Sequence, residues 1–80
     1  MYLKTKYIVT QNNEIITFPE TIQHSEFKHF NPKSAGFISF GLDENRKMIC
    51  NCYGESISLG LKSREREDTD LANRQLLKTL

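Results

Sequence analysis

The sequence predicts an α+β domain, with an antiparallel sheet of four or five strands and a C-terminal helix packed on one face of it. Three observations support this class. β-Branched and aromatic residues gather in segments that Asn, Asp, Gly and Pro separate, as strands and turns require. Near the C-terminus, apolar residues recur every four positions, which is a helical spacing. The 80 residues leave room for one core, so we expect residues 1–80 to form a single domain.

The first two strands are predicted to form a hairpin. Residues 2–10 are rich in β-formers, and residues 14–18 form the returning strand. Residues 11–13, Gln-Asn-Asn, indicate the turn because Asn tolerates the left-handed conformation. Pro19 ends the pair, since proline cannot donate to a strand ladder.

The stretch Thr21–Phe30 fits two structures. Ile22, Phe27 and Phe30 fall loosely on one face of a short helix, but a loop containing a single helical turn fits equally well. Asn31 ends any helix, because the residue before a proline avoids the helical region. The sequence leaves this choice open.

The second half begins with the clearest strand, residues 35–42. It is placed in the centre of the sheet because both of its faces carry an aromatic residue, Phe37 and Phe40. A loop over residues 43–46 leads to the returning strand, residues 47–53. After a bend at Gly54, apolar and small polar residues alternate over residues 55–61, which predicts a half-buried strand.

The final element is predicted to be a helix that begins between Ser63 and Thr69. Acidic and hydroxyl side chains at positions 68–70 suit a helix start, by capping and by the helix dipole. One stripe of the helix is apolar and should pack on the sheet. The stripe consists of Ala72, Leu76, Leu77 and Leu80. Arg74 and Lys78 lie on the opposite side.

Composition and charge exclude several classes of protein. Eleven basic and ten acidic side chains give a net charge of +1, which argues against broad binding to nucleic acid or to an anionic membrane. No apolar run approaches the roughly 20 residues of a membrane-spanning helix. The N-terminus lacks the apolar region of a signal peptide, so we expect a cytoplasmic protein, without a membrane partner.

Cysteine and histidine residues offer a metal site or a nucleophile. His24, His29, Cys50 and Cys52 could form a tetrahedral zinc site, but Cys-x-Cys is not the usual spacing of structural zinc ligands. The competing interpretation makes both cysteines core thiols and both histidines surface loop residues. No catalytic or cofactor motif is present, so we expect no metal and no cofactor. A small enzyme that uses Cys52 and a histidine remains the catalytic alternative.

The segment from Gly54 to Arg74 suggests a site for a small anionic, nucleotide-like ligand. A glycine bend, serine hydroxyls, arginines and a helix N-terminus follow one another there, and these groups bind phosphate or carboxylate. The candidate ligand-binding residues are Tyr53, Ser56, Ser63, Arg64, Arg66 and Arg74. In the competing interpretation, the interleaved acids at positions 65, 67, 68 and 70 neutralise the arginines in exposed ion pairs that contribute little stability.

The stretch Cys52–Arg64, followed by Glu67-Asp68 and Leu71, resembles a segment of small uncharacterised proteins of bacteriophages and mobile elements. The resemblance covers about the last third of the chain. The related segments often carry proline where this chain has Glu65, so the loop departs from the pattern there. The resemblance implies a phage protein in the cytoplasm of a bacterial host. Small phage proteins of this size commonly bind host proteins or sequester small signalling molecules.

These observations leave three candidate functions. The first is a non-enzymatic accessory protein that binds or sequesters an anionic, nucleotide-like ligand. The second is a protein–protein interaction module that inhibits or adapts a host protein, and the third is the small Cys/His enzyme. A homo-oligomer is also expected, because so short a chain buries a modest fraction of its surface and no disulfide compensates.

Overall fold

The computed structural model describes residues 4–77. Its strands and helices are, in chain order, β1 (Thr5–Val9), β2 (Ile15–Pro19), the 3-10 helix η1 (His24–Phe30), β3 (Ser34–Leu42), β4 (Met48–Tyr53), β5 (Glu55–Ser56), β6 (Leu61–Lys62) and α1 (Glu65–Leu76). An antiparallel four-stranded sheet has the order β2-β1-β3-β4, and β5 pairs with β6 in a separate hairpin. The α+β class with a C-terminal helix against the sheet is confirmed.

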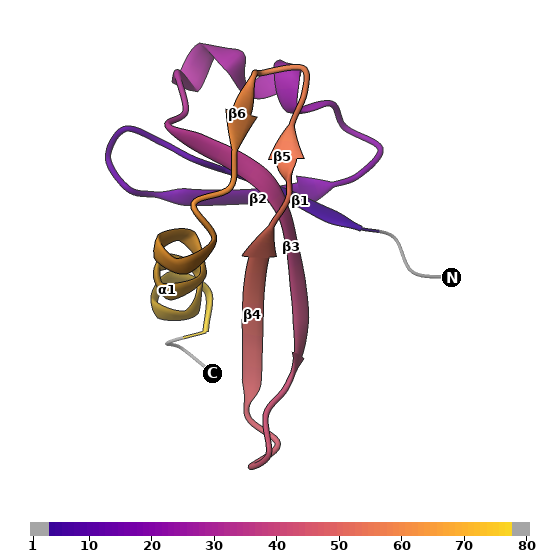
Figure 1. Ribbon diagram of the computed structural model, residues 1–80, viewed down its shortest axis with the longest axis vertical. Coiled ribbons are helices and arrows are strands. Elements are labelled where there is room, and N and C mark those ends of the chain that lie inside the picture. Colours follow the sequence, from indigo (N-terminus) through magenta and orange to yellow (C-terminus); the bar gives the residue numbers. More distant parts are fainter. Residues whose placement is uncertain (1–3, 78–80) are drawn as a thin grey trace.

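Strand β3 is the centre of the sheet, as the sequence predicts. Its first half pairs with β1 up to Ile38, opposite Thr5, and its second half pairs with β4 down to Leu42, opposite Met48. In Figure 1, β1 and β2 cross the view while β4 and the lower half of β3 run down it, so the sheet bends and α1 lies in the inner corner. Residues 39–51 extend beyond β1 as a two-stranded projection, here called the arm.

The two faces of the sheet bury separate apolar clusters, because successive residues of a strand point to opposite faces. Tyr7 and Val9 of β1 face α1, whereas Ile8 faces η1 and the β5–β6 hairpin. Ala72 of the predicted helical stripe is buried, and Leu71 is buried beside it. Leu76 and Leu77 pack partly against this cluster. The predicted positions of Lys78 and Leu80 lie outside the described residues.

A close crossing of the chain explains Gly36. A Cβ atom at this position would lie 2.5 Å from the carbonyl oxygen of Tyr53 and 3.2 Å from Cβ of Ser63. The end of β4, at Tyr53, and the segment before α1, at Ser63, therefore both lie directly against β3. Only glycine permits so close an approach.

The prediction of one strand over residues 55–61 is wrong. The segment is a hairpin whose turn is closed by a hydrogen bond from the Gly60 N–H to the Ile57 carbonyl oxygen (3.1 Å). Gly60 has φ +65°, which glycine adopts without strain, and the Leu59 N–H donates to Ser56 Oγ. Ile57 is 88% exposed at the tip, so the alternation is a coincidence of turn residues and strand residues.

The ambiguous stretch Thr21–Phe30 contains the 3-10 helix η1, which ends where Asn31 adopts the left-handed conformation. The interpretation of both histidines as surface residues is wrong for His24, which is only 4% exposed, while His29 is exposed. The Nε2 atom of His24 lies 2.9 Å from the Gly36 carbonyl oxygen, and its ring meets Phe18 and Phe37 edge-on. Burial is the main cause that lowers the pKa of His24.

Between residues 4 and 77, no helix has the length and apolar character needed to cross a membrane.

Candidate functional site

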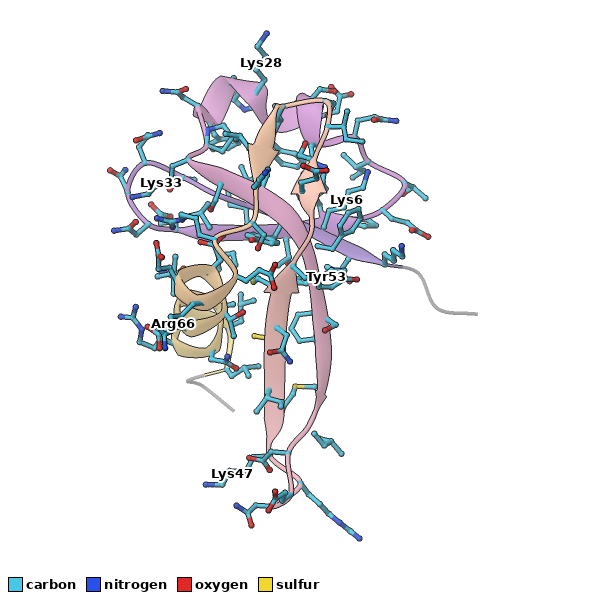
Figure 2. The ribbon with its side chains drawn as sticks, viewed as in Figure 1. Lys6, Lys28, Lys33, Lys47, Tyr53 and Arg66 are labelled. Atoms are coloured by element: carbon cyan, nitrogen blue, oxygen red, sulfur yellow. The ribbon has the colours of Figure 1, made fainter. Side chains whose placement is uncertain are left out.

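An open groove of about 550 Å³ runs between β4 and α1. Strand β4 contributes Asn51 and Tyr53 to its lining, and α1 contributes Glu65, Arg66 and Asp70. Of the six candidate ligand-binding residues, Tyr53 and Arg66 line this groove, and they come from two different elements. Figure 2 labels Tyr53 at the end of β4 and Arg66 on α1.

Tyr53 presents an aromatic ring at the end of β4. The ring stacks on Phe37, with centroids 5.8 Å apart and planes 27° apart, and Tyr53 remains 37% exposed. The Phe37 ring is in turn approached by Nζ of Lys4 at 5.4 Å. Phe37 therefore supports the tyrosine ring, which can still stack on a flat ligand.

Arg66 is the available cation of the groove. Its side chain is exposed on α1 and forms no ion pair with any residue in the described range 4–77. The carboxylate of Asp70 pairs with Arg74 at 2.9 Å, and both of those side chains are exposed. The groove therefore combines one unpaired guanidinium with the carboxylates of Glu65 and Asp70.

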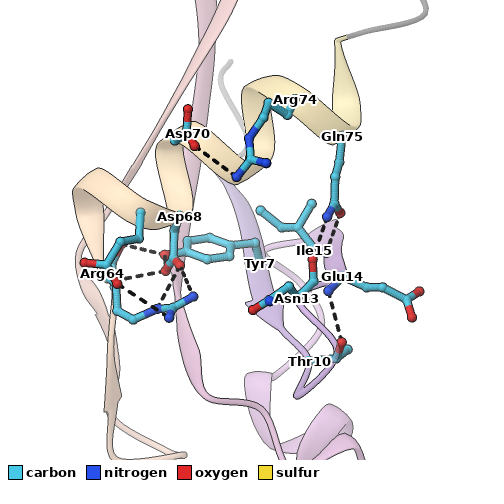
Figure 3. A network of polar contacts seen from close by, with 12 residues as sticks. Tyr7, Thr10, Asn13, Glu14, Ile15, Arg64, Asp68, Asp70, Arg74 and Gln75 are labelled. Atoms are coloured by element: carbon cyan, nitrogen blue, oxygen red, sulfur yellow. Dashed lines mark hydrogen bonds and ion pairs between the residues drawn. The ribbon is translucent and has the colours of Figure 1, made fainter.

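Arg64, in contrast, is engaged by a buried carboxylate (Figure 3). The side chain of Asp68 is fully buried, and its Oδ1 accepts from Nε and Nη2 of Arg64 at 3.1 and 2.9 Å. Its Oδ2 accepts from the Arg64 backbone N–H at 3.0 Å, just before the first turn of α1, and from the Tyr7 hydroxyl at 2.6 Å. The interpretation of the acids as partners in exposed ion pairs is therefore wrong for Asp68.

Tyr7 links this carboxylate to the chain that enters α1. Its hydroxyl lies 2.5 Å from Ser63 Oγ as well as bonding Asp68. Burial, and then the hydrogen bond to Asp68, raise the pKa of Tyr7 well above its usual value, so the phenol keeps its proton. The network ties β1, an inner strand of the sheet, to the first turn of the C-terminal helix.

The serines and Arg74 do not line the groove. Ser63 bonds Tyr7, and Ser56 is buried in the β5–β6 hairpin, where its Oγ accepts from the Leu59 N–H. Arg74 lies one turn beyond Asp70 and pairs with it. These three side chains are used within the protein, and Arg64 is used in the same way.

Sequence reasoning missed the two side chains that hold the β4 side of the groove to α1. Thr69 Oγ1 accepts from the Cys52 N–H at 2.8 Å. Asn73 Oδ1 accepts from the Cys50 N–H, and its Nδ2 donates to the Cys50 carbonyl oxygen, both at 3.0 Å. One helix thus satisfies the outer edge of β4, as a fifth strand would. A signal existed, because Thr69 and Asn73 are spaced by four residues, beside the apolar stripe.

Both cysteines face α1 and are buried, as core thiols. Burial raises the pKa of Cys50, and burial followed by the negative charge of Asp68 raises the pKa of Cys52 to about 12. These thiols therefore stay protonated, whereas nucleophilic and metal-binding cysteines are thiolates. His24 packs with Phe18 on the opposite face of the sheet. Within residues 4–77, no three His, Cys, Asp or Glu side chains gather as a metal site.

Comparison with known protein families, with curated proteins and with solved structures finds no match for this chain. Its function is therefore inferred from the groove and from the chemistry of the side chains that line it.

Proposed function

We propose that this protein is a non-enzymatic binding module for a small anionic, nucleotide-like ligand, which it holds in the groove between β4 and α1. The observation that carries the proposal is that Tyr53 and Arg66, from separate elements, both line one open groove. The proposal keeps these two residues as direct ligand contacts. It gives Ser63 and Arg64 a supporting role, because both belong to the network that holds the start of α1.

The mixed lining of the groove favours a nucleotide over a simple anion. An aromatic ring stacks on a base, and a guanidinium grips a phosphate through two parallel hydrogen bonds. Carboxylates such as Glu65 and Asp70 repel a bare anion, but they accept hydrogen bonds from ribose hydroxyl groups, as acidic residues do in dinucleotide-binding proteins. One ligand that carries a ring, hydroxyls and a phosphate matches all of these groups.

The resemblance of residues 52–64 to phage proteins supplies a setting for this activity. A small binding module made in the cytoplasm of an infected bacterium would sequester a nucleotide signal by holding it, without chemistry. The protonated thiols of Cys50 and Cys52 fit a role that needs no nucleophile. We rank this function above the small Cys/His enzyme for that reason.

Native mass spectrometry of the protein purified from bacteria tests the proposal, together with thermal shift measurements. The probes are the ribonucleoside 5′-monophosphates and 5′-triphosphates, with adenosine and inorganic phosphate as component controls. We expect a retained mass or a shift with at least one nucleotide, and a weaker effect of either component alone. An integer chain mass, with no shift from any of these nucleotides, would overturn the proposal.

Two substitutions locate the site. Tyr53→Ala and Arg66→Ala should each reduce nucleotide affinity by at least tenfold, since each removes one of the two main ligand contacts. Lys28→Ala is the matched control for charge, because Lys28 is an exposed cation at the far end of the molecule, on η1 (Figure 2). Unchanged affinity in both groove variants, or an equal loss in the control, would reject the groove as the site.

The second candidate function is binding to a host protein. It is favoured by exposed apolar side chains on the arm, of which Leu42 is 65% exposed and Met48 47% exposed. A host protein held by this surface should be lost from a pull-down with Leu42→Lys and kept with Arg66→Ala. The opposite pattern would assign the captured protein to the groove.

A further inference from the structure

The protein covers parts of two sheet edges, on β4 and on β2, with its own atoms. On β4, the backbone groups of Cys50 and Cys52 that face outward bond to side chains of α1. On β2, the Ile15 N–H donates to Gln75 Oε1, and the Pro19 carbonyl oxygen accepts from the Ile22 N–H. Such protection is common, because a bare strand edge pairs readily with other chains.

The outer edge of β3 beyond β1 lacks such protection in the described part of the chain. Strand β1 pairs with β3 only as far as Ile38, and within residues 4–77 no strand flanks β3 beyond that point. The Asp43 N–H donates to the Lys47 carbonyl oxygen across the arm. Backbone groups alternate in direction along a strand. This bond therefore indicates that the N–H and C=O groups of Ser39 and Gly41 also point toward β4. The N–H and C=O groups of Phe40 and Leu42 therefore point to the open edge.

The same two residues carry exposed apolar side chains. Phe40 is 45% exposed and Leu42 is 65% exposed, and Leu42 lies opposite Met48 on the face that also holds Cys50. The patch thus continues outward from the buried core toward the tip of the arm. A two-stranded ribbon is only marginally stable in water. An exposed apolar face on such a ribbon indicates a surface that another molecule covers.

The charges beside this edge are complementary to each other. Asp43 and Glu44 follow the end of β3, and Lys4 directly precedes β1, at the other end of the open segment. If a second copy pairs antiparallel through β3, the acidic end of each arm reaches the basic start of β1 in the other copy. A two-fold interface makes each such contact twice, and with a net charge of +1 two copies repel each other little.

From these observations we infer that the open edge of β3 binds the same edge of a second copy, forming a two-fold dimer with a continuous sheet. One register pairs both outward-facing residues of each chain. It places Phe40 opposite Leu42 of the second copy and Gly41 at the two-fold axis. The apolar side chains of both copies then cover one another on one face of the joined sheet. The inference is independent of the ligand groove.

Sedimentation equilibrium on the purified full-length chain tests the dimer. We expect twice the mass of one chain at micromolar concentration, and at least a 100-fold increase of the dissociation constant for Leu42→Lys, which buries two unpaired charges in the interface. Ile57→Lys is the matched control, because Ile57 is 88% exposed on the β5–β6 turn and should not affect dimerisation. A monomeric wild type, or an unaffected Leu42→Lys variant, would overturn the inference.

Two further measurements test the proposed geometry. Glu44→Lys and Lys4→Glu should each weaken the dimer about tenfold, and the double swap should restore it, because the opposite charges still meet. Amide exchange at Phe40 and Leu42 should slow as the protein concentration rises. Protected amides in a monomer would show that the same chain covers the edge, and a pure monomer that captures a host protein through Leu42 would assign the surface to that partner. Either result overturns the dimer.

Discussion

Asp68 shows how strongly one position can differ from its neighbours in a charged run. It is fully buried and accepts hydrogen bonds from Arg64 and Tyr7, whereas Asp70, two residues later, is exposed and pairs with exposed Arg74. An ionised carboxylate is tolerated in the interior only when hydrogen bonds and an opposite charge replace its hydration. The sequence places both residues in the same polar run and does not distinguish between them.

Asp68→Asn should therefore lower the free energy of unfolding by about 2 to 3 kcal/mol, since it removes one partner of a largely buried ion pair and alters the acceptor of Tyr7. Asp70→Asn, the matched control, should cost less than about 1 kcal/mol because its pair is exposed. Urea denaturation of both variants measures the difference. Equal effects would show that the buried network does not stabilise the start of α1.

His24 gives the stability a defined pH dependence. Burial lowers its pKa in the folded protein below the ordinary value of 6.5. Below pH 6.5 the unfolded chain therefore binds a proton that the folded chain does not, and stability falls as the pH is lowered through this window. Above pH 6.5 the contribution of the neutral ring is fully present.

We expect the wild-type urea midpoint to fall between neutral pH and pH values below 6.5. His24→Gln should flatten this dependence, because glutamine can still donate to the Gly36 carbonyl oxygen but does not titrate. His29→Gln changes an exposed residue and should keep the wild-type profile. If the pH dependence of stability persists in His24→Gln and disappears in His29→Gln, it arises from His29, and this prediction is wrong.

At the scale of elements, α1 does more than cover the sheet. Its apolar residues pack on the cluster around Cys50 and Cys52, while Thr69 and Asn73 bond the outer edge of β4. The helix thus serves as core and as edge partner at once. These contacts hold α1 close to β4, and the groove lies between the exposed sides of these two elements.

Asn73→Ala should release the Cys50 N–H and C=O groups and cost about 1 to 2 kcal/mol. The freed edge should also increase aggregation on storage, because it can then pair with other chains. Asn51→Ala is the control, because Asn51 lies on β4, the strand that Asn73 bonds, but is exposed and faces away from the core. Light scattering together with urea denaturation measures both effects. Equal behaviour of the two variants would contradict the edge-capping role.

At the scale of the whole molecule, the crossing at Gly36 is where the sheet, the end of β4 and the entry to α1 meet. Gly36→Ala forces a Cβ atom against the Tyr53 carbonyl oxygen at 2.5 Å, and backbone cannot rotate away as a side chain does. We expect a loss of about 2 kcal/mol or more, as for overpacked cores. Gly41→Ala, on the same strand with nothing within 4 Å, should be neutral or slightly stabilising. Thermal denaturation compares the two variants, and an equal response would mean that the crossing is not tight.

The sequence by itself determined the class of fold, the first hairpin, the central position of β3 and the presence of the C-terminal helix. These features follow from local causes, namely side-chain periodicity and the turn preference of Asn13, which act within a few positions of each other. The capping expected at positions 68–70 is not what starts α1, because the helix begins at Glu65 and its N-cap residue Arg64 has no side-chain cap. The sequence also correctly indicated that Cys50 and Cys52 share the buried face of β4.

Only the tertiary structure decided which polar residues remain available. Arg64 and Arg66 look alike in the sequence, but only Arg64 meets a buried carboxylate, and His24 and His29 differ in burial for the same kind of reason. The alternation over residues 55–61 suggested a strand because it does not reveal that Gly60 turns the chain. Local pattern specifies elements, whereas the partners of a side chain depend on contacts between residues distant in sequence, such as Tyr7 and Asp68. The candidate groove follows from such contacts, because α1 is held against β4 by side chains that no local rule selects.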